Sequence, residues 1–279
     1  MYDRKKRNMY KLIAFDMDGT LLTSQQIIAK ESLQAIKDAK LAGKDIVLAT
    51  GHSVSELKEY GEDLVNIQYG ILESGALIYD FKNKEVLSQK TINKNIVEHI
   101  INILHEKNIM VVAVIEGQDY IQRSHFEELE RYGMEMYHNL FRNTAKFVDD
   151  IDSLLKEKNS HFEKINIYHF DKNQQEDSYR ELILEDADVV KAEKTGIEIT
   201  ALGVKKGNGL KTLCKDLQIP LTEAIAVGDA DNDESMIQEA GLGIAMGNAN
   251  DNIKELASVT VNDNDNGGCA QAIYDYLLS

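Results

Sequence analysis

Short apolar runs, each followed by a polar or glycine-containing loop, recur along the first third of the chain. They are four or five residues long, which is the length of a strand buried inside a sheet. A helical stretch at 30–42, apolar on one face, and a second predicted helix at 54–64 separate them. Strands and helices in alternation predict a parallel, doubly wound sheet. The three runs are LIAF (12–15), DIVLA (45–49) and YGIL (69–72).

The pattern changes after a predicted hairpin, in which ALIYD and EVLSQ flank the turn FKNK (81–84). From residue 84 to 195, helical stretches are grouped with alternating or apolar strands, and this grouping predicts a separate α+β domain. The predicted helices are 95–107 and 148–158, and the predicted strands are 110–115, 120–123, 164–170 and 188–191.

The alternating pattern returns after Thr195. The sequence therefore predicts an α/β fold, in which residues 1–83 and 196–279 form a Rossmann-like, doubly wound parallel-sheet core. Residues 84–195 are then an inserted α+β domain. The later strands are predicted at 197–201, 224–227, 242–245 and 258–261, and the later helices after Gly207, at about 234–240, at 252–256 and from Ala270.

Composition narrows the range of partners. Of the 279 residues, 43% are hydrophobic, which is enough to bury a sizeable core. The net charge of −16 argues against nucleic-acid binding, which needs an excess of Lys and Arg. No apolar run is long enough to predict a membrane span. These features favour a cytoplasmic protein that binds a small molecule, and they carry no signal for the oligomeric state.

The N-terminus and the cysteines add little chemistry. Residues 1–8 are basic, but no apolar segment follows, so they do not resemble a secretory signal. Met9 begins MYKLIAFD, a natural start, so residues 1–8 are interpreted as an extension or a start-site artefact. Cys214 and Cys269 have no disulfide or zinc spacing and are expected to be ordinary buried thiols.

Two aspartates directly follow the first predicted strand. Asp16 and Asp18 are two residues apart, and Gly19 permits a tight turn after them. Ligands of open α/β sheets bind at the carboxyl ends of strands, so both side chains can face one substrate. One carboxylate can act as a nucleophile and the other as a general acid and base. Taken alone, the DxDG string fits an Asx-type turn or a calcium loop as well.

A second acidic cluster, GDADND (228–233), follows the predicted strand AIAV. It places Asp229, Asp231 and Asp233 around one turn, with Asn232 between the last two. Oxygen ligands of this kind suit Mg²⁺. The alternative is an acidic helix N-terminus, which explains the composition but not the pairing with the first motif.

A hydroxyl and an ammonium complete the candidate site. Thr50 and Gly51 end the strand DIVLA, and they can hydrogen-bond a phosphoryl oxygen or cap the next helix. Lys205 and Lys206 precede Gly207 and a predicted helix. Either lysine can neutralise a transferring phosphoryl group, although a solvated lysine is the usual state of such residues.

The order of these motifs resembles that of the haloacid dehalogenase (HAD) phosphatase superfamily. The insertion lies between the second and third motifs, as in the Cof-type phosphatases with a C2B cap. The resemblance covers about residues 9–279, and the inserted domain matches by layout more than by motif. Further Cof-type stretches are ESGALIYD (73–80), GVKKGNGL (203–210), GDADNDESMI (228–237), AGLGIAMGNA (240–249) and NGG (266–268).

The resemblance implies roles for the first two motifs. Asp16 matches the nucleophile, and Asp18 matches the general acid and base. Asp16, the backbone carbonyl of Asp18 and Asp229 match the Mg²⁺ ligands. Thr50 and Gly51 match the phosphate contacts of the second motif.

The resemblance also assigns the later motifs. Lys206, rather than Lys205, matches the phosphate-binding lysine. Asn232 matches a residue that contacts the phosphoryl group, and Asp233 matches the acid that orients the lysine and supports the metal shell. Asn248 falls in the GNA segment near that site.

Two positions depart from the family pattern. The family often reads TGR where this chain has TGH, and NGA where it has SGA, so His52 and Ser74 differ. Neither change removes a catalytic group. His52 is expected at the pocket mouth, where it contacts substrate, or else it is simply a polar residue at a helix start.

The resemblance implies a Mg²⁺-dependent phosphatase of small phosphorylated metabolites, such as sugar phosphates, that works through an aspartyl-phosphate. Its cap would close over the site and exclude water. A phosphomutase of the phosphomannomutase type and an inactive sensor of phosphorylated metabolites are the alternatives. A receiver-type signalling module is disfavoured, because a receiver is about half as long and needs no acid and base at Asp18. No motif in 84–195 identifies the substrate.

Overall fold

The computed structural model describes residues 9–279, so the predicted extension, residues 1–8, lies outside the described residues. The chain divides into two compact units. The first contains the segment that ends at Gly51, Tyr60–Ser88 and Lys205–Ser279, and the second contains His52–Glu59 and Gln89–Val204.

The first unit is built on an eight-stranded sheet in the order β14-β13-β12-β1-β2-β3-β4-β5. The pairings from β14 to β3 are parallel, and β4 turns back antiparallel to β3. Strand β1 is central, and all four of its side chains are fully buried. The strands are β1 (Leu12–Phe15), β2 (Asp45–Ala49), β3 (Tyr69–Leu72), β4 (Leu77–Asp80), β5 (Glu85–Gln89), β12 (Ala224–Gly228), β13 (Leu242–Ala245) and β14 (Val259–Thr260).

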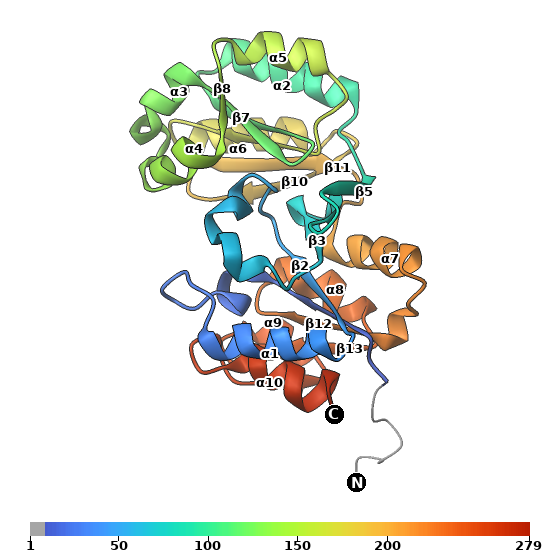
Figure 1. Cartoon of the computed structure of the whole chain (residues 1–279). Coiled ribbons are helices and arrows are strands. Elements are labelled where there is room, and N and C mark those ends of the chain that lie inside the picture. The colour runs from blue at the N-terminus through green and yellow to red at the C-terminus, as the bar shows by residue number, and fades with distance from the viewer. Residues whose placement is uncertain (1–8) are drawn as a thin grey trace. The chain divides into compact units, whose positions relative to one another are not determined.

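Two groups of helices flank this sheet: α1 packs against α10, and α8 packs against both α7 and α9 (Figure 1). The predicted doubly wound, Rossmann-like α/β core is confirmed. The helices are α1 (Lys30–Leu41), α7 (Lys206–Asp216), α8 (Glu234–Glu239), α9 (Asp251–Leu256) and α10 (Gly268–Ala272). Shorter helical turns lie at Met17–Leu21, Glu73–Gly75, Leu221–Glu223, Asp231–Asp233 and Ile273–Leu277.

The second unit is built on a six-stranded sheet in the order β10-β11-β9-β6-β7-β8. The pairings are antiparallel except for β7 with β8. The strands are β6 (Met110–Ile115), β7 (Gln118–Gln122), β8 (Lys146–Val148), β9 (Lys164–Tyr168), β10 (Ala187–Ala192) and β11 (Gly196–Ala201).

Helices α2, α5 and α6 bury an aliphatic core against one face of this sheet, whereas residues 123–145 cover part of the other face with an aromatic cluster. This mixture of helices and antiparallel strands is the predicted α+β architecture. The helices are α2 (Lys94–Glu106), α3 (Arg123–Glu127), α4 (His138–Thr144), α5 (Ile151–Lys158) and α6 (Lys172–Leu182), with 3-10 turns at Leu129–Tyr132 and Glu135–Tyr137.

Several elements differ from those predicted. The sequence predicts the strand at 197–201 as part of the parallel core, but β11 pairs antiparallel with β9 and β10. A short apolar strand carries no sign of whether its partners are parallel, and this explains the error. The helix predicted at 54–64 is a 3-10 segment, Glu56–Leu64, interrupted at Gly61. The helix predicted at 148–158 starts only at Ile151, because Lys146–Val148 form β8.

Two other expectations concern membrane spans and thiols. No helix among residues 9–279 is both long and apolar enough to cross a membrane. Cys214 and Cys269 are buried free thiols, as expected.

One buried acid of the second unit makes its stability depend on pH. Glu163 is fully buried, and its Oε1 accepts hydrogen bonds from the Glu116 amide and the Gln89 side chain. Burial raises the pKa of Glu163 from 4.5 to about 7, although these hydrogen bonds oppose the change. The folded state therefore holds a proton between these two pH values that the unfolded chain has lost. Its stabilising effect is complete below about pH 4.5 and is lost as the pH rises to about 7.

We expect Glu163→Gln to flatten the pH dependence of unfolding. Between pH 5 and 7 the wild type should lose up to about 1 kcal/mol more per pH unit than the variant, because only the wild type releases this proton. Urea denaturation at pH 5, 6 and 7 measures the difference. Glu130→Gln, at an exposed position of the same unit, is the control and should match the wild type. Equal slopes for wild type and Glu163→Gln would contradict the expectation.

Candidate active site

The site begins where β1 ends. Asp16 directly follows this strand and is only 5% exposed. The chain then turns through Met17–Leu21, with Gly19 at φ +74°. A Cβ atom at Gly19 would lie 2.4 Å from Asp229 Oδ2, so this turn requires glycine both for its backbone angle and for space.

A buried lysine joins two of the aspartates. Lys206 is the first residue of α7 and is 1% exposed. Its Nζ donates a short hydrogen bond to Asp16 Oδ1 and a second, of 2.7 Å, to Asp233 Oδ1. Charges this deep are stable only when paired and hydrogen-bonded, and here one ammonium serves two carboxylates.

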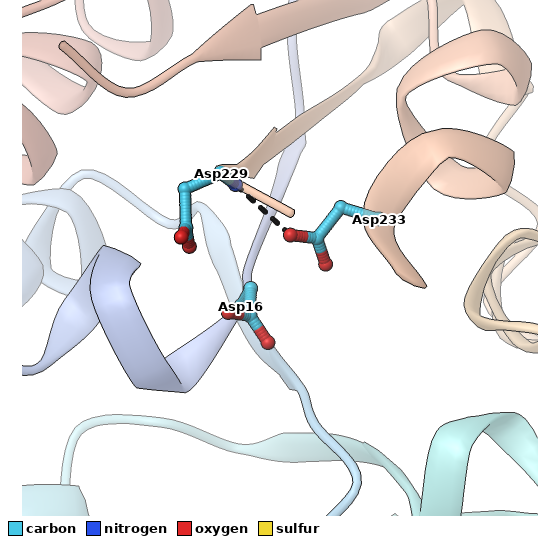
Figure 2. Close-up of side chains that lie close together, drawn as sticks. All are labelled: Asp16, Asp229 and Asp233. Carbon is cyan, nitrogen blue, oxygen red and sulfur yellow. Dashed lines mark hydrogen bonds between the residues drawn. The ribbon is translucent and has the colours of Figure 1, made fainter. Parts of the chain in front are cut away.

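Asp233 is held on its other side by backbone amides. Its Oδ2 accepts from the Asp229 amide at 2.9 Å (Figure 2). The same oxygen accepts from the Ala230 amide at 3.1 Å. Both oxygens of this fully buried carboxylate are therefore occupied. A Cβ at Gly228 would lie 2.5 Å from the Asp233 side chain, which is why β12 ends in glycine.

Asp229 is fixed by Thr20, a residue for which no role was predicted. The Thr20 hydroxyl donates to Asp229 Oδ1 at 2.7 Å, and Thr20 is 1% exposed. The signal was available, because Thr20 is the last residue of the DMDGT motif. The turn after β1 and the loop after β12 are thus tied together by a side-chain hydrogen bond.

Three carboxylates converge at this point. Each of Asp16, Asp229 and Asp233 offers one oxygen, and the three oxygens lie within 4.8 Å of one another (Figure 2). This is an all-oxygen donor set of the kind that hard divalent cations use.

Burial shifts the pKa values of the charged groups in this cluster. Burial raises the pKa of Asp16 to about 7; Lys206 opposes this change and Asp233 adds to it. Burial alone would lower the pKa of Lys206. The carboxylates of Asp16 and Asp233 raise this pKa by more than burial lowers it, so the ammonium stays charged. Burial also raises the pKa of Asp229, against the hydrogen bond from Thr20.

The remaining predicted residues lie in the loops around this cluster or outside it. Asp18 is exposed in the turn after β1, and Asn232 is exposed in the turn Asp231–Asp233. Thr50 is buried at the end of β2, where its amide donates to the Ile71 carbonyl at 2.9 Å and Gly51 follows it.

Asn248 lies beside the turn after β1, whereas His52 lies in the other unit of the chain. The Asn248 side chain donates to the Gly19 carbonyl at 2.7 Å, so it supports the turn after β1. His52 belongs to the second unit, where its Nδ1 lies 3.9 Å from Glu56 Oε2.

Comparison with known proteins agrees with this arrangement. The family model of haloacid dehalogenase-like hydrolases matches residues 13–273. Over 272 residues the chain is 28% identical to 5-amino-6-(5-phospho-D-ribitylamino)uracil phosphatase YcsE of Bacillus subtilis (96% of each chain covered). Over 285 residues it is 30% identical to Phosphatase YwpJ of the same organism (96% and 100% covered). A haloacid dehalogenase-like hydrolase from Bacteroides thetaiotaomicron has a similar structure, with a TM-score of 0.83, 25% identity, and 95% and 99% of the two chains covered.

The fold, the matches and the buried site together define a hydrolase built on a Rossmann-like sheet with an inserted α+β unit. The chain belongs to the haloacid dehalogenase-like hydrolase family, and the predicted class, a Cof-type phosphatase, is confirmed.

The paired charges lead to a test on stability. We expect Lys206→Met to destabilise the protein by about 3–5 kcal/mol, because it leaves two buried carboxylates without their cation. The cost should be smaller at pH 5.5 than at pH 8, because Asp16 loses the group that lowers its pKa and becomes neutral at the lower pH. Urea denaturation at both pH values measures this.

The adjacent lysine gives the control. Lys205 is exposed, so Lys205→Met should change the unfolding free energy by less than about 0.5 kcal/mol. A Lys206→Met protein as stable as Lys205→Met at pH 8 would show that the buried pair does not contribute as argued.

Proposed function

We propose that the protein is a Mg²⁺-dependent phosphatase that hydrolyses small phosphorylated metabolites through a phosphoryl group carried on Asp16. The observation that supports this most directly is the buried Lys206, which contacts both Asp16, directly after β1, and Asp233, in the loop after β12, beside Asp229. A nucleophilic carboxylate, a fixed ammonium and a cation-binding acid are what phosphoryl transfer to an aspartate needs.

In the proposed first step, a carboxylate oxygen of Asp16 attacks phosphorus and the bond from phosphorus to the substrate oxygen breaks. The Asp18 carboxyl gives its proton to that leaving oxygen. Lys206 fixes the direction of the Asp16 carboxylate through Oδ1, which leaves Oδ2 for the attack. The Lys206 ammonium also balances negative charge on the phosphoryl oxygens, and we assign the Thr50 hydroxyl, the Gly51 amide and Asn232 as further contacts to them.

In the second step, the Asp18 carboxylate takes a proton from water as the water oxygen attacks phosphorus. The bond between phosphorus and Asp16 breaks, inorganic phosphate leaves, and both aspartates return to their starting states. Asp18 suits this exchange because it is exposed in the turn and can reach water, whereas Asp16 is buried.

The donor set fits a divalent cation. Asp16 and Asp229 offer carboxylate oxygens close together, and we assign the Asp18 backbone carbonyl as a further ligand. Mg²⁺ bound there would neutralise charge on the phosphoryl group. Asp233 and Thr20 act on the ligands rather than on the ion, because they orient Lys206 and Asp229.

The substrate class rests on the relatives and on charge. YcsE is named as a phosphatase of a phosphorylated ribitylaminouracil, which is a small metabolite. With a net charge of −16, the chain is unsuited to nucleic acid. We propose that residues 84–195 act as a cap that selects the leaving group, that His52 contributes to this selection, and that the enzyme works in the cytoplasm.

A phosphomutase remains the main alternative, because it needs the same nucleophile and lysine. Incubation with a sugar monophosphate distinguishes the two: a phosphatase releases inorganic phosphate, whereas a mutase returns an isomeric ester. An inactive sensor would bind the ester and release neither product. A panel of phosphomonoesters with Mg²⁺ then identifies the substrate.

We expect Asp16→Asn to abolish phosphate release, because an amide cannot form the acyl-phosphate. Asp18→Asn should also be nearly inactive but should accumulate a phosphoryl adduct, because the base that activates water is lost. Phosphate release and intact-mass spectrometry after mixing with substrate measure both effects.

Asp231→Asn is the matched control, since Asp231 is an exposed acid in the GDADND loop with no assigned role, and it should retain activity. Near-normal turnover by purified, folded Asp16→Asn would sink the mechanism.

We expect EDTA to remove activity, Mg²⁺ to restore it and Ca²⁺ to inhibit, because a larger and looser ion misplaces the nucleophile. Asp229→Asn should weaken Mg²⁺ binding by at least about tenfold, as loss of a ligand or of its support typically does. Isothermal titration with MgCl₂ measures binding independently of turnover. Full activity after exhaustive chelation would contradict the metal requirement.

A further inference from the structure

Side chains from two distant segments hold the turn after β1, and all of these residues belong to the first unit. Asp18 and Gly19 have non-helical backbone angles, so a regular helix does not fix this part of the chain. Instead, three carbonyl groups of residues 19–22 accept hydrogen bonds from side chains that lie 229 to 249 residues away along the chain. The contacts are Asn248 Nδ2 to the Gly19 carbonyl at 2.7 Å, Cys269 Sγ to the Thr20 carbonyl at 3.2 Å and Asn264 Nδ2 to the Leu22 carbonyl at 2.9 Å.

Asn264 connects two of these contacts. Its backbone amide donates to Asn248 Oδ1 at 3.1 Å. A side-chain amide accepts only through its oxygen, so this contact orients Asn248 with Nδ2 towards the Gly19 carbonyl. The Asn264 side chain itself reaches the Leu22 carbonyl. One residue of the loop after β14 therefore holds the turn directly at Leu22 and, through Asn248, at Gly19.

The loop that carries Asn264, residues 262–267, is itself fixed. Within the loop, Asp263 Oδ1 accepts from the Asp265 amide at 3.1 Å. At the edge of the loop, Asp265 Oδ1 accepts from the Ser24 amide at 2.8 Å. The loop is thus joined to the chain that follows β1 by the side chains of both Asn264 and Asp265, and Asn264 has a defined position from which to act.

Gly19 is the residue of the turn whose conformation most needs to be fixed. Its φ is +74°, and without a Cβ atom it can adopt many other backbone angles. Both of its neighbours have roles in the proposed metal site: the Asp18 carbonyl is assigned as a ligand, and the Thr20 hydroxyl fixes Asp229. The backbone angles of Gly19 set the directions of these two groups relative to each other, and the hydrogen bond from Asn248 holds those angles.

Stability alone explains these contacts poorly. Asn248 is exposed and Asn264 is only half-buried. A hydrogen bond at such a position contributes little net free energy to folding, because water can replace it. What the two side chains contribute is direction, since each donates to a carbonyl group at one defined point of a non-helical turn.

We propose that Asn248 and Asn264 form a positioning pair for the Mg²⁺ site. Together they fix the backbone at Gly19, and this backbone sets the directions of the groups on either side of it, the Asp18 carbonyl and the Thr20 hydroxyl. The inference rests on the proposed function, which assigns Mg²⁺ to the Asp18 carbonyl. Neither asparagine touches substrate or metal in this proposal.

The test uses the full-length protein and titration calorimetry with MgCl₂. We expect Asn248→Ala and Asn264→Ala each to weaken Mg²⁺ binding by about tenfold, the lower end of what loss of a residue that orients a metal ligand costs. The double variant should lose less than the product of the two single losses, because Asn264 acts in part through Asn248. Phosphate release should fall most at limiting Mg²⁺ and should recover as Mg²⁺ saturates, because the bound ion then holds the Asp18 carbonyl.

Asn83→Ala is the matched control. Asn83 Nδ2 donates to Asp80 Oδ2 at 3.0 Å in the turn between β4 and β5 of the same unit, and Asp80 makes none of the contacts described above. The substitution removes the same kind of side-chain hydrogen bond, so Mg²⁺ affinity should stay unchanged whatever happens to the unfolding temperature. If Asn264→Ala does not fold, Asn248→Ala decides alone, since Asn248 is exposed and its truncation leaves the core intact.

The outcomes are distinct. If Asn248→Ala and Asn264→Ala both bind Mg²⁺ as tightly as Asn83→Ala does, the contacts are structural and the inference is wrong. If the wild type binds Mg²⁺ but hydrolyses no ester, the proposed phosphatase activity fails, and the Mg²⁺ affinities of the variants still decide the inference. A wild type that binds no Mg²⁺ overturns the inference, whether or not it hydrolyses esters.

Discussion

The buried contact of Lys206 with Asp16 and Asp233 is the constraint on which the first unit depends. None of the three charges is stable alone at this depth, because the cost of desolvation exceeds what any neutral surrounding returns. Each residue comes from a different part of the chain: the end of β1, the start of α7 and the loop after β12. The charges are therefore compensated only when all three segments have reached their native places, and the site and the fold of the core form together.

The parallel sheet supplies the geometry that this contact requires. Strand β12 lies directly beside β1, in register from Leu12 with Ala224 to Phe15 with Val227. Because the two strands are parallel, the residues that follow them emerge at the same edge. The turn after β1 and the loop after β12 approach so closely that there is no room for side chains at Gly19 and Gly228. The hydrogen bond from Thr20 to Asp229 joins these two loops. Acidic residues that repel one another are thus held together by backbone amides, one hydroxyl and one ammonium.

The convergence of the Lys206 and aspartate side chains could be predicted from the sequence, because the pattern that indicates it is local. Asp16, Lys206, Asp229 and Asp233 each follow a short apolar strand or begin a helix, and strand ends converge in any parallel sheet. Pairing across the inserted sheet is not local, and the prediction of the strand at 197–201 in the parallel core is therefore wrong. The contacts of Ser53 and Ser55 with Asp119 could not be predicted either, because Asp119 lies more than 60 residues away along the chain. Thr20 could have been assigned from its motif, but nothing in one sequence reveals which carboxylate its hydroxyl meets.

Burial destabilises the charged groups of the site, because it removes them from water, but the same burial suits Asp16 to the proposed nucleophilic attack. A carboxylate in water is a weak nucleophile because water solvates it, and Asp16 is instead surrounded by β1, Lys206 and the neighbouring acids. Its raised pKa, about 7, expresses how poorly the charge is solvated at this depth. Lys206 keeps one oxygen of Asp16 oriented and remains charged throughout, since two carboxylates raise its own pKa. In the proposed reaction the Asp16 carboxylate loses its charge as the bond to phosphorus forms, the phosphoryl oxygens keep theirs, and Asp18 is left as a carboxylate. The fixed ammonium of Lys206 balances the charge on Asp16 before the attack and the charge on the phosphoryl oxygens during the transfer. A solvated lysine would have to reorganise during that transfer, whereas Lys206 is already held by hydrogen bonds before the substrate arrives.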